Sequence, residues 1–264
     1  MSKKVSNLYM GLVFALLYLP IMVVILYSFN DAKSILWKGF TFRWYAELFR
    51  DEAIMRSLAN TLLVAVISAI VSTILGTMAV IGIHNLKKRT RTLVLNTSYL
   101  PIINPEIVTG VSLMLLFSFL GVLLGFEMGM GTVILAHISF SVPYVILNVL
   151  PKLRQMNKHI YEAALDLGCR PMRAFFKVVL PEIFPGVLSG FLMAFTFSLD
   201  DFIITYFVRG ATFQTLPIEI YSMLRRRISP KINALSALLF VTVLIALILV
   251  HVKDYRKKEK PQRV

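Results

Sequence analysis

The sequence has few charged residues and almost no cysteine, and both shortages limit what the chain can be. Only 16% of its 264 residues are charged, whereas 57% are hydrophobic. This composition is typical of a membrane protein and not of a soluble domain. The single cysteine, Cys169, excludes an intrachain disulfide and a cysteine-rich metal site. We interpret Cys169 as an incidental reduced thiol.

Motifs for nucleotide binding and for hydrolysis are also missing. The sequence has no Gly-x-x-x-x-Gly-Lys-Ser/Thr loop, and indeed no Gly-Lys pair, so the chain is not itself a P-loop ATPase. It has no His-Glu-x-x-His zinc motif, no Gly-x-Ser-x-Gly elbow and no cluster of histidines. We therefore expect no enzyme activity, no metal site and no cofactor in this chain. A membrane enzyme becomes a remote alternative.

Six apolar segments are long enough to cross a bilayer. They cover residues 8–29, 58–83, 97–120, 132–150, 186–208 and 232–251. The first segment is too long for the apolar part of a signal peptide and lacks a small-residue cleavage site, so we expect it to be retained. The sequence predicts an all-α integral membrane protein with one transmembrane domain over residues 1–264.

Lysines and arginines indicate the orientation of these spans. Eighteen of the 28 basic residues lie near the two termini, in the turn 87–91 and in the loop 151–185. Cytoplasmic loops are enriched in Lys and Arg, so both termini are predicted to be cytoplasmic, and nucleic-acid binding is not needed to explain the net charge of +14. The arginine triplet 225–227 lies in a loop that is predicted to be outside, so this triplet taken alone favours the opposite orientation. We keep six spans because moving this triplet inside would require an odd number of spans or place the loop 151–185 outside.

Two features flank the apolar spans. In the outer loop 30–57, aromatic and leucine residues recur at helical spacing from Phe42 to Phe49, which predicts an interfacial amphipathic helix. The third span opens with Pro101 and Pro105, and because prolines remove backbone donors we expect a bend there that faces protein or water.

The loop 151–185 contains a polar stretch whose residue order is specific. Residues 162–167 favour a helix, Gly168 can adopt the left-handed conformation that ends a helix, and Pro171 fits the first turn of a second helix. Pro181 is expected to end that second helix. The sequence therefore predicts two short helices joined by a sharp elbow.

The first of these short helices has the surface of a docking element. Ala163 and Ala164 leave one face nearly smooth, which allows close seating in a groove of another protein. Glu162 and Asp166 are four residues apart and share a neighbouring face.

Three carboxylates lie within apolar spans, namely Glu106, Asp200 and Asp201. A charge near the bilayer centre costs at least about 2.5 to 3.5 kcal/mol on insertion scales, so these acids require a function. We interpret them as groups that replace the water shell of a permeating cation. Two alternatives stay open: a protonated carboxyl at a helix interface, and an acid paired with a basic residue of a partner subunit.

The fifth span suggests how its two acids divide their roles. Ser198, Asp201 and Thr205 lie three and four residues apart and share one polar face of a continuous helix, so we expect Asp201 to contact the substrate directly. Asp200 is expected to orient it or to face a partner. His137 in the fourth span is interpreted as a packed, hydrogen-bonded residue and not as a ligand.

The motifs resemble those of a transporter family. Glu-Ala-Ala at 162–164, Gly168 and Leu-Pro at 180–181 resemble the cytoplasmic loop of the permease subunits of ABC importers. Three further motifs match: Pro-Glu at 105–106, Ser-Leu-Asp-Asp-Phe at 198–202 and Phe-Arg-Trp-Tyr in the outer loop. They extend the resemblance to the spermidine/putrescine permeases of the C type. The similarity covers nearly the whole chain, although position 106 is Glu where relatives also have Asp.

The resemblance implies a fold, a set of residue roles and a set of partners. The fold would be that of a type I ABC importer permease, with a cytoplasmic coupling helix in the loop 151–185. The polyamine path would include Trp44, Glu106, Ser198, Asp200 and Asp201. The residues that couple to the ATPase would be Glu162, Ala163, Ala164, Asp166 and Gly168.

The implied partners are a homologous second permease, an ABC ATPase dimer that binds the ATP, and an extracytoplasmic polyamine-binding protein. The chain would be a multi-pass protein of a bacterial cell membrane, in contact with lipid and with no nucleic acid. Separated carboxylates and aromatic faces suit polyamines, which carry spaced ammonium groups on methylene stems. Two alternatives remain: the same fold importing another organic cation, an aminophosphonate or an iron-type substrate, and a cation channel or secondary transporter without an ATPase.

Overall fold

The computed structural model describes residues 3–32, 36–226 and 230–258, and these residues form helices and no β-strand. One isolated bridge joins Asn30 and Phe40. The chain divides into two compact units: unit 1 comprises Met1–Met55 and Glu219–Val264, and unit 2 comprises Arg56–Ile218. The all-α prediction is confirmed for the described residues.

Within the described ranges, five helical segments are long and apolar enough to cross a membrane. They are Val5–Tyr27, Glu52–His84, Glu106–Leu124, Met130–Gln155 and Pro171–Asp200. The described apolar part of the last helix, Pro230–Thr242, is shorter. Each of the six predicted segments overlaps one of these helices, while the number of spans and the side of the termini stay predictions.

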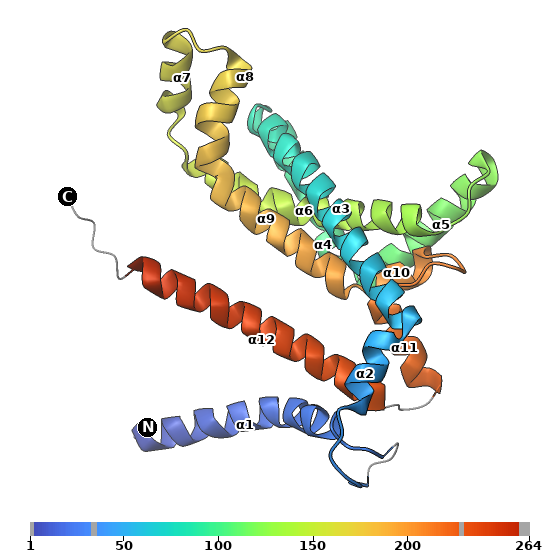
Figure 1. Cartoon of the computed structure of the whole chain (residues 1–264). Helices are drawn as coiled ribbons and strands as arrows, with labels where there is room; N and C mark the ends of the chain where they lie inside the picture. Colours follow the sequence, from blue (N-terminus) through green and yellow to red (C-terminus); the bar gives the residue numbers. More distant parts are fainter. Residues whose placement is uncertain (1–2, 33–35, 227–229, 259–264) are drawn as a thin grey trace. The chain divides into compact units, whose positions relative to one another are not determined.

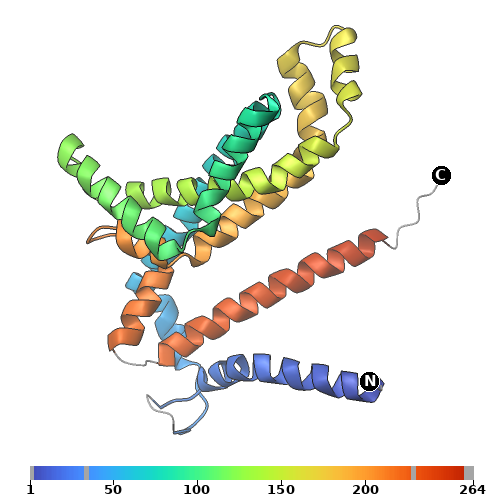
Figure 2. The same cartoon turned by 180° about the vertical axis from the view of Figure 1, so that it is seen from behind.

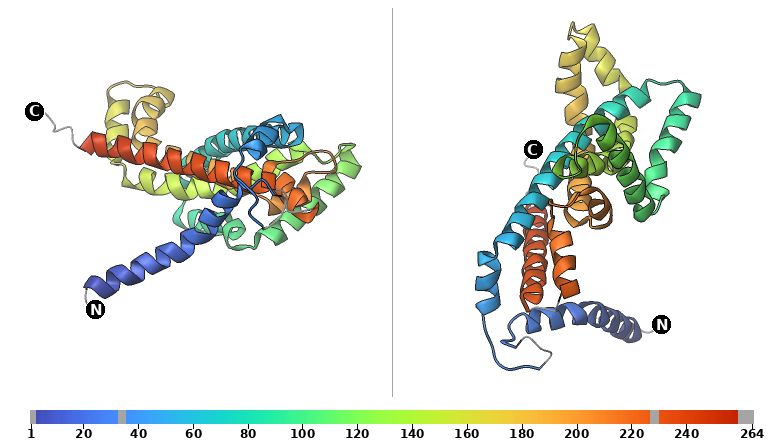
Figure 3. Two further views of the ribbon diagram at one scale, coloured as in Figure 1. Left: turned by 60° about the horizontal axis from the view of Figure 1, so that its bottom comes forward. Right: turned by 90° about the vertical axis from the view of Figure 1, so that its right-hand side faces the viewer.

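Unit 1 contains α1 (Lys3–Tyr27), α2 (Arg43–Arg50) and α12 (Pro230–Lys258). The end of α1 contacts α12, and the two helices diverge from there (Figures 1 and 3). Helix α2 confirms the amphipathic helix predicted in the outer loop, and it packs on α12. Lys231 at the start of α12 lies 3.3 Å from the Asp51 carboxylate and 3.7 Å from that of Glu47, which fastens the two helices.

Unit 2 is built around a tight contact between three helices. These are α3 (Glu52–His84, whose first residues belong to unit 1), α6 (Met130–Gln155) and α9 (Leu180–Asp200), of which α6 and α9 run alongside each other (Figure 1). Val145 of α6 is fully buried between Gly76 of α3 and Gly190 of α9. A Cβ atom at Gly76 would lie 2.6 Å from the Val145 side chain, and one at Gly190 would lie 3.2 Å from its Cα. Glycine is therefore required for this close approach.

The third predicted span consists of two helices. Helix α4 (Lys88–Ile103) contains Pro101 and ends before Asn104, and α5 (Glu106–Leu124) begins after Pro105. Asn104 is extended, with ψ 139, as expected for a residue that precedes proline. The predicted interruption is confirmed at Pro105, whereas Pro101 lies inside α4.

The predicted elbow in the loop 151–185 is also confirmed. Helix α7 (Lys158–Asp166) ends two residues before Gly168, whose φ is +80. The N–H groups of Gly168 and Cys169 donate to the carbonyls of Leu165 and Ala164, at 2.8 and 3.0 Å. This pair of bonds satisfies the last carbonyls of α7 and forms a Schellman motif.

The second helix of the elbow is much longer than predicted. Helix α8 (Pro171–Ala174) starts at Pro171 as expected, but it continues through a π-helical segment, η1 (Phe175–Val179), directly into α9 (Figure 2). The prediction that Pro181 ends this helix is wrong. Leu180 donates to the carbonyl of Phe175, five residues back, so the hydrogen-bond pattern has already changed before the proline, which occupies the first turn of α9.

The fifth predicted span is interrupted. Helix α9 ends at Asp200, Asp201 is extended with ψ 122, and α10 (Ile203–Val208) follows. The continuous helix expected over residues 186–208 is therefore wrong. Helix α11 (Leu216–Arg226) then leads to the boundary between the units.

The glycine contacts give a first prediction. Gly76→Ala is expected to lower the free energy of unfolding by about 1 to 3 kcal/mol, because the added methyl group overpacks the Val145 contact. Gly82→Ala on the same helix is the control, since a Cβ atom there has no neighbour within 4 Å. Thermal unfolding of the purified protein in detergent measures both variants. Equal stability of the two variants would contradict the role of Gly76.

Candidate functional site

A buried polar network lies where α9 gives way to α10. At its centre is His137 of α6, whose side chain is 1% exposed. Its Nδ1 lies 2.6 Å from the Ser198 hydroxyl and its Nε2 lies 2.9 Å from the Thr205 hydroxyl. Both ring nitrogens therefore have hydroxyl partners, and the expectation of a packed, hydrogen-bonded histidine is confirmed.

Asp201 belongs to the same network. Its Oδ2 lies 3.3 Å from Nε2 of His137 and accepts hydrogen bonds from the backbone N–H and the hydroxyl of Thr205, at 2.8 and 2.7 Å. Its Oδ1 accepts a hydrogen bond from the backbone N–H of Ile204 at 3.3 Å. The carboxylate thus satisfies N–H groups in the first turn of α10 that have no partner within the helix.

The network extends to a fourth helix through a serine pair. The hydroxyl of Ser68 on α3 lies 3.0 Å from that of Ser198 on α9, and both side chains are buried. Ser68 also bonds to the carbonyl of Val64 in its own helix at 2.6 Å. Side chains from α3, α6, α9 and the start of α10 are therefore joined by one chain of polar contacts.

Asp200 differs from its neighbour in exposure. The side chain of Asp201 is only 6% exposed, whereas Asp200 at the end of α9 is exposed. From the sequence we expected Asp201 to contact the substrate directly and Asp200 to have a supporting role. In the structure Asp200 is the more accessible of the two carboxylates.

Glu106 is the first residue of α5, which packs on α10. A Cβ atom at Gly110, one turn after Glu106, would lie next to Phe207 and Ile204 of α10. Glu106 is exposed, as Asp200 is.

Trp44 is placed in unit 1, away from solvent. The residue is 2% exposed, and its indole N–H donates to the backbone carbonyl of Asn30 at 2.8 Å. The Asn30 side chain in turn accepts from the N–H groups of Ala32 and Lys38. Trp44 therefore holds the loop before α2 against the helix.

The proposed docking residues lie on the exposed elbow. Glu162, Ala163, Asp166 and Gly168 are exposed, and Ala164 is half-buried. Glu162 contacts Nδ1 of His159 in its own helix at 3.1 Å. The elbow also exposes apolar side chains, of which Leu167 is 89% accessible. This combination suits a surface that a partner covers.

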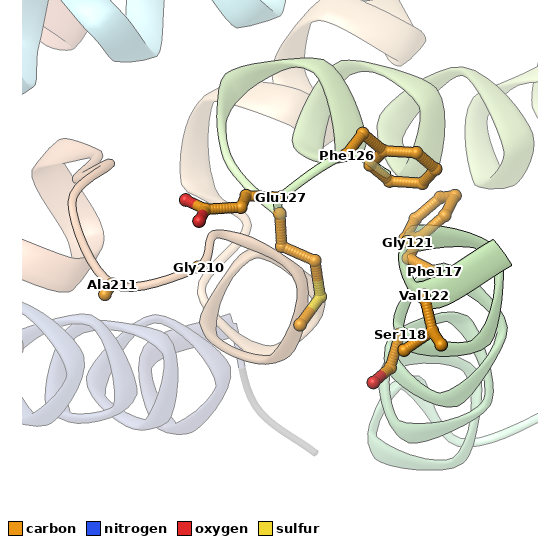
Figure 4. A pocket seen from close by; sticks show the side chains of 9 residues that line it. Phe117, Ser118, Gly121, Val122, Phe126, Glu127, Gly210 and Ala211 are labelled. Carbon is orange, nitrogen blue, oxygen red and sulfur yellow. The ribbon is translucent and has the colours of Figure 1, made fainter. Parts of the chain in front are cut away.

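A shallow pocket lies elsewhere in unit 2, beside the end of α5. It has a volume of about 350 Å³ and is mostly apolar, with Ser118 and Glu127 as polar groups (Figure 4). The lining residues are Phe117, Ser118, Gly121, Val122, Phe126, Glu127, Met128, Gly210 and Ala211. None of the predicted path residues lines it. Among the described residues there is also no group of three His, Cys, Asp or Glu side chains that could hold a metal ion.

Sequence reasoning missed the partnership of His137 with Asp201. The two residues are 64 positions apart, and no local spacing connects them. The sequence does contain a clue, since Ser68, His137, Ser198 and Thr205 are polar residues within three of the apolar segments. Such residues tend to find one another when helices pack in a membrane.

Comparison with known proteins identifies related sequences and folds. Residues 72–255 match the family described as binding-protein-dependent transport system inner membrane component. The chain is 39% identical to the putrescine transport system permease protein PotI of Escherichia coli K12, over 87% of the chain and 83% of that protein. It is 34% identical to the spermidine/putrescine transport system permease protein PotC of Haemophilus influenzae, over 92% and 93%.

A solved structure shares the fold at low identity. A chain of a bacterial ABC transporter involved in the import of the acidic polysaccharide alginate superposes with a TM-score of 0.68 and 16% identity. The superposition covers 97% of this chain and 95% of that one. The match shows that the helices are arranged as in an ABC importer permease, as the sequence predicted.

The buried network yields a double-mutant cycle. His137→Ala and Asp201→Ala are expected to interact by about 0.5 to 3 kcal/mol in the free energy of unfolding, because each removes the same contact. His137→Ala combined with Asp200→Ala is the control pair, and these effects are expected to add within about 0.5 kcal/mol. Unfolding of the purified variants measures both cycles. Additive effects for the His137 and Asp201 pair would refute the contact.

Proposed function

Because the chain belongs to the family of binding-protein-dependent transport system inner membrane components, we propose that it is the permease subunit of an ATP-driven importer of spermidine or putrescine. It is a multi-pass protein of the bacterial inner membrane. The observation that supports the cargo proposal is the exposure of two carboxylates within unit 2, Asp200 at the end of α9 and Glu106 at the start of α5.

The fold of the chain and the charge of its cargo are determined by different features of the sequence. The alginate transporter has the same helical arrangement and is described as importing an acidic polysaccharide. The fold therefore does not set the charge of what passes, and a few side chains must do so. Carboxylates in an apolar unit favour a cation, and the relatives named for putrescine and spermidine support an organic one.

The side chains divide into contact and positioning roles in this proposal. Asp200 and Glu106 replace part of the water shell of an ammonium group by charge-assisted hydrogen bonds. Asp201 and Ser198, together with His137, hold the break after α9 and so fix the position of Asp200. Trp44 stays a predicted path residue, although its buried ring and its bond to Asn30 support a structural role in this chain.

The partners follow from the same family. The family description names a binding protein that delivers the substrate. We assign the energy source to an ABC ATPase dimer that binds ATP, so this chain needs no cofactor, and the other half of the path to a second, homologous permease. Helix α7 would dock on the ATPase through its exposed face, and the movement of the elbow would switch packed helices between two states.

Uptake measurements test the cargo. In cells that lack their own polyamine importers and express all partner subunits, we expect radiolabelled spermidine or putrescine to enter with the native chain. Asp200→Asn and Glu106→Gln should each lower uptake about tenfold or more, because a charge-assisted hydrogen bond contributes about 1.5 to 3 kcal/mol. Glu127→Gln, which changes an exposed acid outside the proposed path, is the control.

Membrane abundance is measured for every variant in the same cells. Uptake that is unchanged by both Asp200→Asn and Glu106→Gln would remove these acids from the path. Absence of spermidine and putrescine uptake with the native chain would refute the cargo, and competition with other organic cations and with aminophosphonates would then identify the class.

A further prediction concerns α7, which we propose is the coupling helix. Ala163→Trp is expected to abolish co-purification of the ATPase, because the bulky ring prevents close seating of the smooth face of α7. Gln155→Trp, an exposed position at the end of α6, is the matched control and should keep the ATPase. Retention of the ATPase by Ala163→Trp would show that this face of α7 does not form the docking contact, whereas absence of the ATPase from the native preparation would favour a channel or secondary transporter.

A further inference from the structure

An aromatic pair lies next to the two exposed carboxylates. The rings of Tyr144 on α6 and Phe197 on α9 have centroids 4.5 Å apart, with an angle of 53° between their planes. Both residues are only half-buried. The pair therefore contributes accessible ring surface at the end of the α6 and α9 contact where the polar network lies.

The carboxylates approach this pair from two helices. Phe197 and Asp200 are three residues apart in the last turn of α9, so they share one face of that helix. Glu106 at the start of α5 lies within electrostatic range of Tyr144 on α6. Each ring thus has an acidic neighbour, and the two acids come from different elements.

The surrounding elements supply no positive charge of their own. The sequence contains no lysine or arginine between Arg91 and Lys152, nor between Lys177 and Arg209. These two intervals include the whole of α5, most of α6 and the whole of α9 and α10. His137 is the only histidine in them, and it is enclosed in the buried network. No lysine or arginine of these intervals can therefore pair with Asp200 or Glu106, and both carboxylates stay available to a cation from outside the chain.

We propose that the Tyr144 and Phe197 rings form a binding surface for organic ammonium groups, flanked by the carboxylates of Asp200 and Glu106. An ammonium within about 6 Å of a ring centroid is attracted by the ring face, and methylene stems lie favourably on the same surface. A strongly hydrated inorganic cation gains its binding from oxygen ligands instead. The carboxylates select positive charge, and the rings select an alkylammonium over an inorganic ion.

The experiment uses the complete transporter in cells and rests on the proposed function. Tyr144→Leu and Phe197→Leu keep apolar bulk and remove the ring, whereas Tyr144→Phe and Phe197→Tyr keep the ring. We expect each leucine variant to lower spermidine uptake about 3- to 30-fold at limiting substrate, as the loss of a cation–π contact implies. The two variants that keep a ring should restore most of the uptake, which a purely steric role would not produce.

Controls separate this effect from loss of folding. Phe184→Leu, an exposed ring at the start of the same helix, should leave uptake unchanged. Membrane abundance and ATPase co-purification should be equal in all variants.

The outcomes distinguish the two hypotheses. Loss of uptake in the leucine variants with recovery in the ring-keeping variants supports the aromatic surface. Equal uptake in the native and leucine variants overturns it and leaves the polyamine importer intact. Absence of spermidine and putrescine uptake with the native chain overturns the proposed function, and the aromatic surface loses its ligand with it.

Discussion

The fold of unit 2 depends on the Asp201 carboxylate, which accepts hydrogen bonds where the helix is interrupted between α9 and α10. Where α9 stops, N–H groups at the start of α10 lose their helical partners, and in apolar surroundings such groups are costly to leave unpaired. The Asp201 carboxylate accepts two of them, and it contacts His137 of α6 and the Thr205 hydroxyl. Because Asp201 is extended, the chain changes direction here, and Asp200 remains exposed at the helix end while its neighbour is buried. One buried acid thus positions one accessible acid.

Much of this arrangement follows from local sequence. Hydropathy located the apolar helices, and Gly168, Pro171 and Pro105 marked three boundaries that the structure confirms, since each acts through its own backbone. The failures have non-local causes or a change in helix type. Pro181 is accommodated because the π-helical segment alters the hydrogen-bond pattern before it. The spacing of Ser198, Asp201 and Thr205 selected residues that do belong to one network, but Ser198 is joined to Thr205 through His137 of another helix. Asp201 bonds to Thr205 directly, at the start of α10 and not on a shared face of a continuous helix. The resemblance assigned Trp44 to the path, but it could not show that the ring is buried and donates to the carbonyl of Asn30.

The long helical segment of unit 2 connects the two ends of the proposed mechanism. Residues 171–200 are helical without interruption, so about 45 Å of chain joins the elbow at Gly168 to the carboxylate of Asp200. A helix of this length transmits displacement along its axis, and Gly186 and Gly190 let it lie close against α6. The charge distribution predicts that the elbow end of this helix is cytoplasmic. The π-helical segment lies near that end, and it is the one departure from α-helical geometry within residues 171–200. Because the helix stops immediately after Asp200, movement of the elbow would be delivered to the acid that we propose contacts the cation. The buried network beyond that point joins α3, α6 and α10, so it would resist the same movement. The coupling end and the binding end therefore act on one helix, and the Asp201 contact fixes where that helix ends.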